Sequence, residues 1–188
     1  MYSAFGKRVL DLFIVFVAFL VLSPLIFLVI LLIRIFDSGP IFFTQDRVGK
    51  DANLFKLYKF RSMPVNTGDI PSDKVGEVKI TWIGKLIRRT NIDELPQLLN
   101  IFKSDMSIVG PRPPIPAQTE LISLRKDNSS ISIKPGLTGL AQINSFDGMS
   151  FEEKASFDKE YYREITFWKD LKIISGTVLY LFKSPPVY

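Results

Sequence analysis

The sequence predicts an α+β fold that is mostly helical, with an N-terminal membrane helix followed by a small globular domain that contains a β-hairpin and amphipathic helices. Three observations support this prediction. Residues 9–33 are almost entirely apolar, two segments rich in aromatic and β-branched residues flank a short turn, and later segments carry apolar residues at helical spacing. We therefore expect a membrane segment at residues 1–36 and a globular domain at residues 37–188.

The apolar stretch is interrupted only by Asp11, Ser23 and Pro24. At about 1.5 Å per residue it is long enough to cross a hydrocarbon core of ~30 Å, and it is too long for the apolar part of a signal peptide. Proline removes a backbone donor, so the helix is expected to kink or break at Ser23-Pro24. Two interpretations stay open: one kinked helix that crosses the membrane, or a re-entrant helix whose arms return to one face. Basic residues flank both ends, so the positive-inside rule selects no direction.

The globular part is expected to begin with a β-hairpin. Its strands are predicted at residues 41–48 and 54–63, around a turn at 49–52, and a polar loop at 65–78 follows. Periodicity predicts helices at residues 82–89, 93–103, 117–125, 151–162 and 167–182, while 106–116 and 135–139 are predicted to be a loop and a turn. Several of these helices place bulky aromatic residues beside Lys or Arg. This composition suits helices lying on a membrane surface, although apolar stripes facing a soluble core also account for it.

Composition narrows the chemistry. The chain contains neither Cys nor His, which excludes disulfides and argues against structural zinc and against Ser-His or Cys-His nucleophiles. A bound metal would be a hard cation held by oxygen ligands, of which Mg²⁺ is the commonest. The net charge of +5, together with the membrane segment, favours anionic lipids and phosphate-bearing substrates as partners over nucleic acid.

Two adjacent carboxylates, Asp93 and Glu94, are the central candidates for chemistry. They stand at the start of a predicted helix, where the macrodipole favours an ionised carboxylate. Carboxylates also form covalent phosphoenzymes, so an aspartyl phosphate is chemically reasonable. Acidic residues at helix N-termini are commonly plain capping residues, and position alone leaves that alternative open.

Basic residues in the same part of the sequence could bind phosphate. Lys59 and Arg61 alternate on a predicted strand, so both point to one face of the hairpin. Arg112 stands among prolines on a stiff backbone, and Arg88 precedes Asp93 by about one helical turn. Such cations could together neutralise a pyrophosphate, although Lys and Arg often simply face solvent or lipid.

An ordered set of short motifs resembles the bacterial sugar transferase family, the monotopic phosphoglycosyl transferases, and in particular its small minimal members. The stretches that carry the resemblance are Lys7-Arg8, Ser23-Pro24, FTQDRVG (43–49), YKFRSM (58–63), RRTNIDELPQL (88–98), DMSIVGPRP (105–113), KPGLTGLAQ (134–142) and DLKI (170–173). Each is weak alone, but the ordered set extends along nearly the whole chain. Leu140, Ser145 and Glu160 depart from the family pattern, which puts the sugar-specific contacts in doubt.

The resemblance implies a re-entrant membrane helix and a catalytic domain at the cytoplasmic face of the bacterial inner membrane. It implies transfer of a sugar-1-phosphate from a UDP-sugar to undecaprenyl phosphate, with release of UMP. Asp93 would be the nucleophile, and Mg²⁺ would lie near Glu94 and Asp93. Lys59, Arg61, Arg88 and Arg112 would bind the phosphates. The family pattern further implies nucleotide or sugar contacts by Gln142, Asp158 and Tyr161.

Other functions remain compatible with the residues taken alone. The main rival is a non-catalytic membrane-bound scaffold or lipid-binding protein whose basic face holds anionic lipid. A second is a transferase whose N-terminal helix crosses the membrane once. The sequence leaves the sugar, the glycan and the oligomeric state open, a homodimer included.

Overall fold

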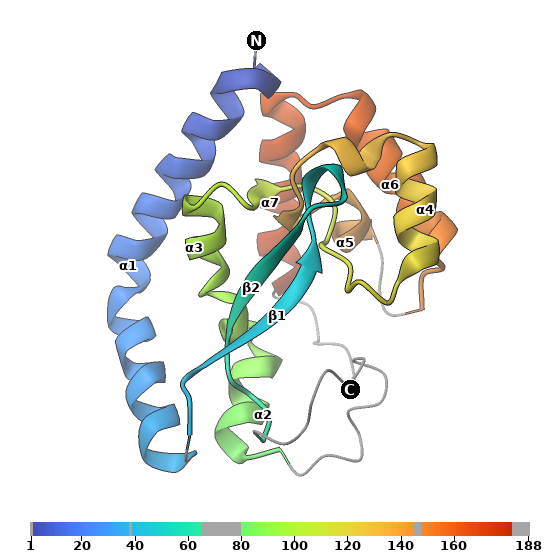
Figure 1. Ribbon diagram of the computed structural model, residues 1–188. Coiled ribbons are helices and arrows are strands. Elements are labelled where there is room, and N and C mark those ends of the chain that lie inside the picture. Colours follow the sequence, from blue (N-terminus) through green and yellow to red (C-terminus); the bar gives the residue numbers. More distant parts are fainter. Residues whose placement is uncertain (1, 38, 65–79, 145–147, 182–188) are drawn as a thin grey trace.

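The long N-terminal helix forms one side of the molecule. The computed structural model describes residues 2–37, 39–64, 80–144 and 148–181. After a π-helical turn at Tyr2–Gly6, helix α1 (Lys7–Phe36) follows a curved path beside the other elements (Figure 1). By length and composition α1 could cross a membrane, and little of it is buried inside the protein.

The expected break at Ser23-Pro24 does not end the helix, because α1 continues through Pro24. Pro24 has no N–H to donate to the carbonyl of Leu20, four residues earlier. The hydroxyl of Ser23 donates to that carbonyl instead, at 3.2 Å. The Ser-Pro pair thus supplies a replacement donor for the one that proline removes.

The predicted hairpin is confirmed. Strands β1 (Phe42–Val48) and β2 (Leu54–Phe60) pair antiparallel, from Phe42 opposite Phe60 to Val48 opposite Leu54. A 3₁₀ turn at Lys50–Ala52 connects them. The predicted loop at 65–78 lies outside the described residues.

The rest of the described chain is mainly helical. The elements, in order, are α2 (Trp82–Arg89), a 3₁₀ turn (Ile92–Glu94), α3 (Gln97–Phe102), β3 (Ser107–Val109), α4 (Thr119–Asp127), a 3₁₀ turn (Ser130–Ser132), β4 (Gly136–Thr138), α5 (Leu140–Asn144), α6 (Phe151–Arg163) and α7 (Phe167–Leu181). Strands β3 and β4 pair in parallel, within segments expected to be a loop and a turn. In Figure 1 the hairpin lies between α1 on one side and α4 and α6 on the other.

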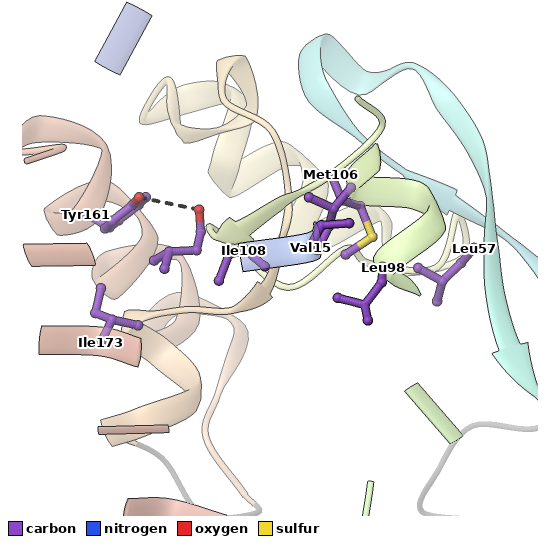
Figure 2. Packing of buried hydrophobic residues seen from close by; sticks show 9 residues of the cluster. Val15, Leu57, Leu98, Met106, Ile108, Tyr161 and Ile173 are labelled. Atoms are coloured by element: carbon purple, nitrogen blue, oxygen red, sulfur yellow. Dashed lines mark hydrogen bonds between the residues drawn. The ribbon is translucent and has the colours of Figure 1, made fainter. Parts of the chain in front are cut away.

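Two apolar clusters join α1 to the globular part. Val15, in the first half of α1, packs into a core that runs from Leu57 and Leu98 to Tyr161 and Ile173 (Figure 2). The second half of α1 contributes residues to another cluster, with Phe60 of β2 and the buried face of α2. Both halves of α1 therefore pack against the same small domain.

Polar contacts also fix the start of α1. Asp170, buried at the beginning of α7, accepts hydrogen bonds from Lys7 at 2.6 Å, from Tyr2 at 2.6 Å and from Tyr161 at 2.5 Å. Arg8 donates to the carbonyls of the last residues of α3. A buried carboxylate needs such partners because desolvating an isolated charge is costly.

Candidate active site

The two predicted carboxylates lie in the 3₁₀ turn that precedes α3, and they do not open a continuous helix as expected. Pro96 is the physical reason, since it has no N–H to donate to the carbonyl of Ile92. That carbonyl accepts from Leu95 instead, at 3.1 Å, which tightens the backbone into a 3₁₀ turn. The side chains of Asp93 and Glu94 are only 12% and 15% exposed, so both are largely buried.

Two cations from distant parts of the chain meet at Glu94. Nζ of Lys59, from β2, lies 2.9 Å from Oε1 of Glu94 and 3.9 Å from Oδ2 of Asp93. Arg112, from the loop after β3, places Nη2 2.6 Å from the same Glu94 oxygen and Nη1 3.5 Å from Oε2. The hydrogen bonds of these two cations therefore concentrate on Glu94, and the ion pair of Asp93 with Lys59 is longer, at 3.9 Å.

This arrangement separates the acidities of the two carboxyl groups. Burial raises the pKa of Asp93 to about 6, and the neighbouring Glu94 charge adds to this effect while Lys59, Arg88 and Arg112 oppose it. Burial also acts to raise the pKa of Glu94, but the charges and hydrogen bonds of Arg112 and Lys59 outweigh it and hold that pKa well below its usual range. At neutral pH both groups are ionised, and Asp93 is the more basic.

The other predicted phosphate-binding residues are placed differently. Arg88, in the last turn of α2, is near enough for its charge to lower the pKa of Asp93. Arg61 lies just beyond β2, where its Nη2 donates to the Asp37 carbonyl at 2.7 Å and lies 3.2 Å from Oδ1 of that residue. Arg61 thus ties the end of α1 to the hairpin, and phosphate binding by Arg61 remains a prediction.

A residue that the sequence did not single out fixes the strand that carries Lys59. Asn100 of α3 is fully buried, accepts from the Tyr58 amide at 3.0 Å and donates to the Lys56 carbonyl at 2.7 Å. β2 pairs with β1 on one edge, so Asn100 supplies partners on the other edge. Helix α3, which follows Asp93 and Glu94, is therefore hydrogen-bonded directly to β2, the strand that carries Lys59.

Close packing of two backbones places Arg112. A Cβ added to Gly136 of β4 would lie 2.1 Å from the amide nitrogen of Gly110, and one added to Gly110 would lie 2.5 Å from the carbonyl oxygen of Lys134. Only glycine permits this approach, because any side chain would overlap backbone atoms. The segment that precedes Arg112 consequently lies against β4 without intervening side chains.

The three residues predicted to contact nucleotide or sugar have internal positions. Asp158 and Tyr161 of α6 are buried, Asp158 against Arg125 and Tyr161 against Asp170. Either side chain would have to leave these partners to reach a substrate. The amide atoms of Gln142 in α5 are buried and have no hydrogen-bond partner among the described residues. Substrate contacts by these three residues stay predictions.

The carboxylate pair fits a magnesium ion that is shared with a substrate. Within the described parts of the chain, no group of three or more acidic residues could hold a metal by itself. Mg²⁺ is commonly bound by one or two carboxylates together with water and substrate phosphates. Asp93 and Glu94 satisfy this modest requirement.

The fold and the site together define a protein with a long apolar helix along a small domain and an acidic pair beside several cations. Comparison with known families identifies the class of protein to which this arrangement belongs. The chain belongs to the bacterial sugar transferase family, whose sequence model matches residues 2–184.

Three relatives illustrate the range of the match. The chain is 36% identical over 191 residues to UDP-glucose:undecaprenyl-phosphate glucose-1-phosphate transferase of Escherichia coli (strain K12), covering 97% of this chain and 41% of the relative. It is 40% identical over 176 residues to the uncharacterized sugar transferase EpsL of Bacillus subtilis (strain 168), covering 92% and 85%. It is 32% identical over 204 residues to undecaprenyl-phosphate galactose phosphotransferase of Salmonella typhimurium, covering 99% and 42%. The chain thus spans about two fifths of the length of the first and third relatives.

Proposed function

We propose that this chain is a phosphoglycosyl transferase that moves a sugar-1-phosphate from a UDP-sugar to undecaprenyl phosphate and releases UMP. The observation that carries the proposal is the meeting of Lys59 and Arg112 at Glu94, beside an ionised Asp93 of raised pKa. Family membership and the names of the relatives, which act on UDP-glucose or on undecaprenyl phosphate, support the same reaction.

The reaction proceeds in two displacements. A carboxylate oxygen of Asp93 attacks the β-phosphorus of the UDP-sugar and forms an O–P bond. The bond from that phosphorus to the oxygen bridging the two phosphates breaks, and UMP leaves with the electron pair. An oxygen of undecaprenyl phosphate then attacks the same phosphorus, the bond to Asp93 breaks, and the carboxylate is regenerated.

The surrounding groups bind and orient the pyrophosphate. Lys59 and Arg112 stabilise the negative charge that develops on the leaving phosphate, with Arg88 close by. Asp93 and Glu94 would hold Mg²⁺ together with the nucleotide phosphates, and the ion would supply charge neutralisation there. Glu94 keeps the two cations in place between reaction cycles.

The anchoring of α1 supports a membrane position in which both of its ends lie on one side of the bilayer. Arg8 near its start is bonded to α3, and Asp37 just after its end is bonded to Arg61, so both ends are held by the same domain. A helix that crossed the membrane would place its ends on opposite sides. Large apolar side chains remain exposed on α1, on α2 at Trp82, on α3 at Phe102 and on α7 at Trp168. We infer a re-entrant helix with the domain on the cytoplasmic face of the bacterial inner membrane.

The enzymatic proposal is tested with purified protein, Mg²⁺ and a panel of UDP-sugars. UMP release is expected with undecaprenyl phosphate present, and the donor alone should give a burst of about one UMP per enzyme. Mass spectrometry of the protein treated with donor alone should then show a phosphosugar on the Asp93 peptide. Rapid turnover with no burst and no added mass would reject the covalent route in favour of direct transfer.

Membrane topology has its own test, because the native chain contains no Cys. A Ser3→Cys variant in intact cells should resist a membrane-impermeant thiol reagent and react after the cells are opened. A Cys introduced at the exposed residue Asp127 provides the control for the domain side. Labelling of Cys at position 3 from outside would show that α1 crosses the membrane.

A further inference from the structure

Arg112 lies in a four-residue segment, 111–114, and each backbone carbonyl of this segment accepts a hydrogen bond. The other three residues are prolines, which have no N–H, so the segment offers mainly acceptors. Each carbonyl accepts from a different donor. The pairs are Pro111 with the Gly136 amide at 2.9 Å, Arg112 with Nη1 of Arg125 at 2.9 Å, Pro113 with Nη1 of Arg47 at 3.0 Å, and Pro114 with the Val48 amide at 3.0 Å.

The bond to the Arg112 carbonyl comes from a buried ion pair. Arg125 of α4 is 4% exposed, and Asp158 of α6 is 2% exposed. Nε and Nη2 of Arg125 lie 2.8 and 2.7 Å from Oδ2 of Asp158, which leaves Nη1 to donate to the Arg112 carbonyl. A guanidinium in the interior needs a counter-charge, and Asp158 provides it. The two helices thereby hold one donor at a fixed place beneath the loop.

The Arg112 side chain itself has little enclosure. It is 51% exposed, and its Nη2 lies 2.6 Å from Oε1 of Glu94, a residue from another part of the chain. A long exposed side chain keeps one orientation only if its backbone is fixed, because side-chain ordering is entropically costly. Small misplacements matter at a reaction centre, where a shift of about 1 Å can lower the rate 100-fold.

We infer that Arg125 and Asp158 are positioning residues for phosphoryl transfer, acting through the Arg112 backbone to aim the Arg112 guanidinium at Glu94 and the substrate phosphates. For its substrate the inference rests on the proposed function. It gives Asp158 a role that does not require contact with sugar or nucleotide. The arrangement links α6 and α4 to the acidic pair through one backbone carbonyl.

A double variant separates positioning from stability. Arg125→Met alone leaves the Asp158 carboxylate buried without its partner, so the variant should lose both stability and activity. Arg125→Met combined with Asp158→Leu removes both charges, and apolar replacement of a buried pair commonly restores stability. The double variant should therefore unfold near the wild-type temperature, yet its kcat/KM for UMP release should remain at least about tenfold below wild type.

A further readout reports the position of Arg112. Phenylglyoxal modifies arginine side chains, and mass spectrometry of the Arg112 peptide measures its rate without any substrate. In the double variant this modification of Arg112 should be several-fold faster than in the wild type. Asp158→Asn, which keeps an oxygen acceptor for Arg125, should give smaller changes in the same directions and serves if the double variant does not fold.

Lys169→Met is the matched control, since Lys169 forms ion pairs with Glu160 of α6 and with Glu164 and makes no described contact with the Arg112 loop. It should leave kcat/KM and the phenylglyoxal rate at their wild-type values. Wild-type kcat/KM in a folded double variant, or an unchanged phenylglyoxal rate, would overturn the positioning role. Wild-type protein that releases no UMP from any UDP-sugar would overturn the proposed function alone, because the modification rates would still report on Arg112.

Discussion

Replacing Asp93 by Asn is expected to abolish UMP release and at the same time to stabilise the protein at neutral pH. Burial raises the pKa of Asp93 from 3.8 to about 6 in the folded protein. Between these values the folded state binds more protons than the unfolded state, so the free energy of unfolding falls as pH rises through this window and stays lower above it. A difference of about 2 pKa units corresponds to about 3 kcal/mol of lost stability at neutral pH. Asn has nearly the same shape as Asp and carries no charge, so the variant should recover most of that energy.

The assay is thermal unfolding of wild type and Asp93→Asn in the same detergent. Near neutral pH the variant should unfold roughly 5–10 °C higher, and the difference should shrink as the pH approaches about 4, where Asp93 of the wild type becomes protonated. Asp46→Asn is the control, because Asp46 forms an exposed ion pair with Lys56 that contributes little. A variant less stable than wild type near neutral pH, or a difference independent of pH, would refute the reasoning from burial.

Other perturbations address the neighbouring groups. The rate constant of the donor-only burst should fall about tenfold per pH unit below about pH 6, since only ionised Asp93 attacks, and a rate constant that does not change down to about pH 4 would contradict this. Glu94→Gln removes a charge that raises the pKa of Asp93, so the acid limb of the pH–rate profile should move to lower pH while the rate falls. A shift to higher pH would contradict this, and would mean that Lys59 and Arg112 had moved away from Asp93. Asn100→Ala removes the partners of the Tyr58 amide and the Lys56 carbonyl, and it should lower the free energy of unfolding by about 2–4 kcal/mol, measured by denaturant titration.

Elements with strong local signals could be predicted from the sequence. The hairpin was predicted at residues 41–48 and 54–63, and the strands occupy Phe42–Val48 and Leu54–Phe60. Alternating aromatic and β-branched residues around a turn are a local pattern. Strands β3 and β4 were missed because each has three residues and finds its partner far along the chain. Parallel pairing of such short segments depends on tertiary packing, which local periodicity does not report.

The candidate site shows the same division. The motifs singled out Lys59, Asp93, Glu94 and Arg112, and the structure brings these side chains together. The sequence did not indicate that both cations would concentrate on Glu94, because strand register and loop path set these distances. Arg125 did leave a signal that could have been used. It follows Leu121 by four residues, so the two share a helix face, and a charge on a buried face requires a partner.

In the proposed mechanism, the unequal environments of the two carboxylates would suit Asp93 to act as the nucleophile. If Lys59 and Arg112 bonded Asp93 as they bond Glu94, the pKa of Asp93 would fall, and its oxygens would be both weakly basic and occupied by donors. If the cations were absent, burial and the Glu94 charge would raise the pKa further, and the group would be protonated at neutral pH. Concentrating the cations on Glu94 avoids both outcomes, because their charges still act on Asp93 across a longer distance while its oxygens remain available for attack.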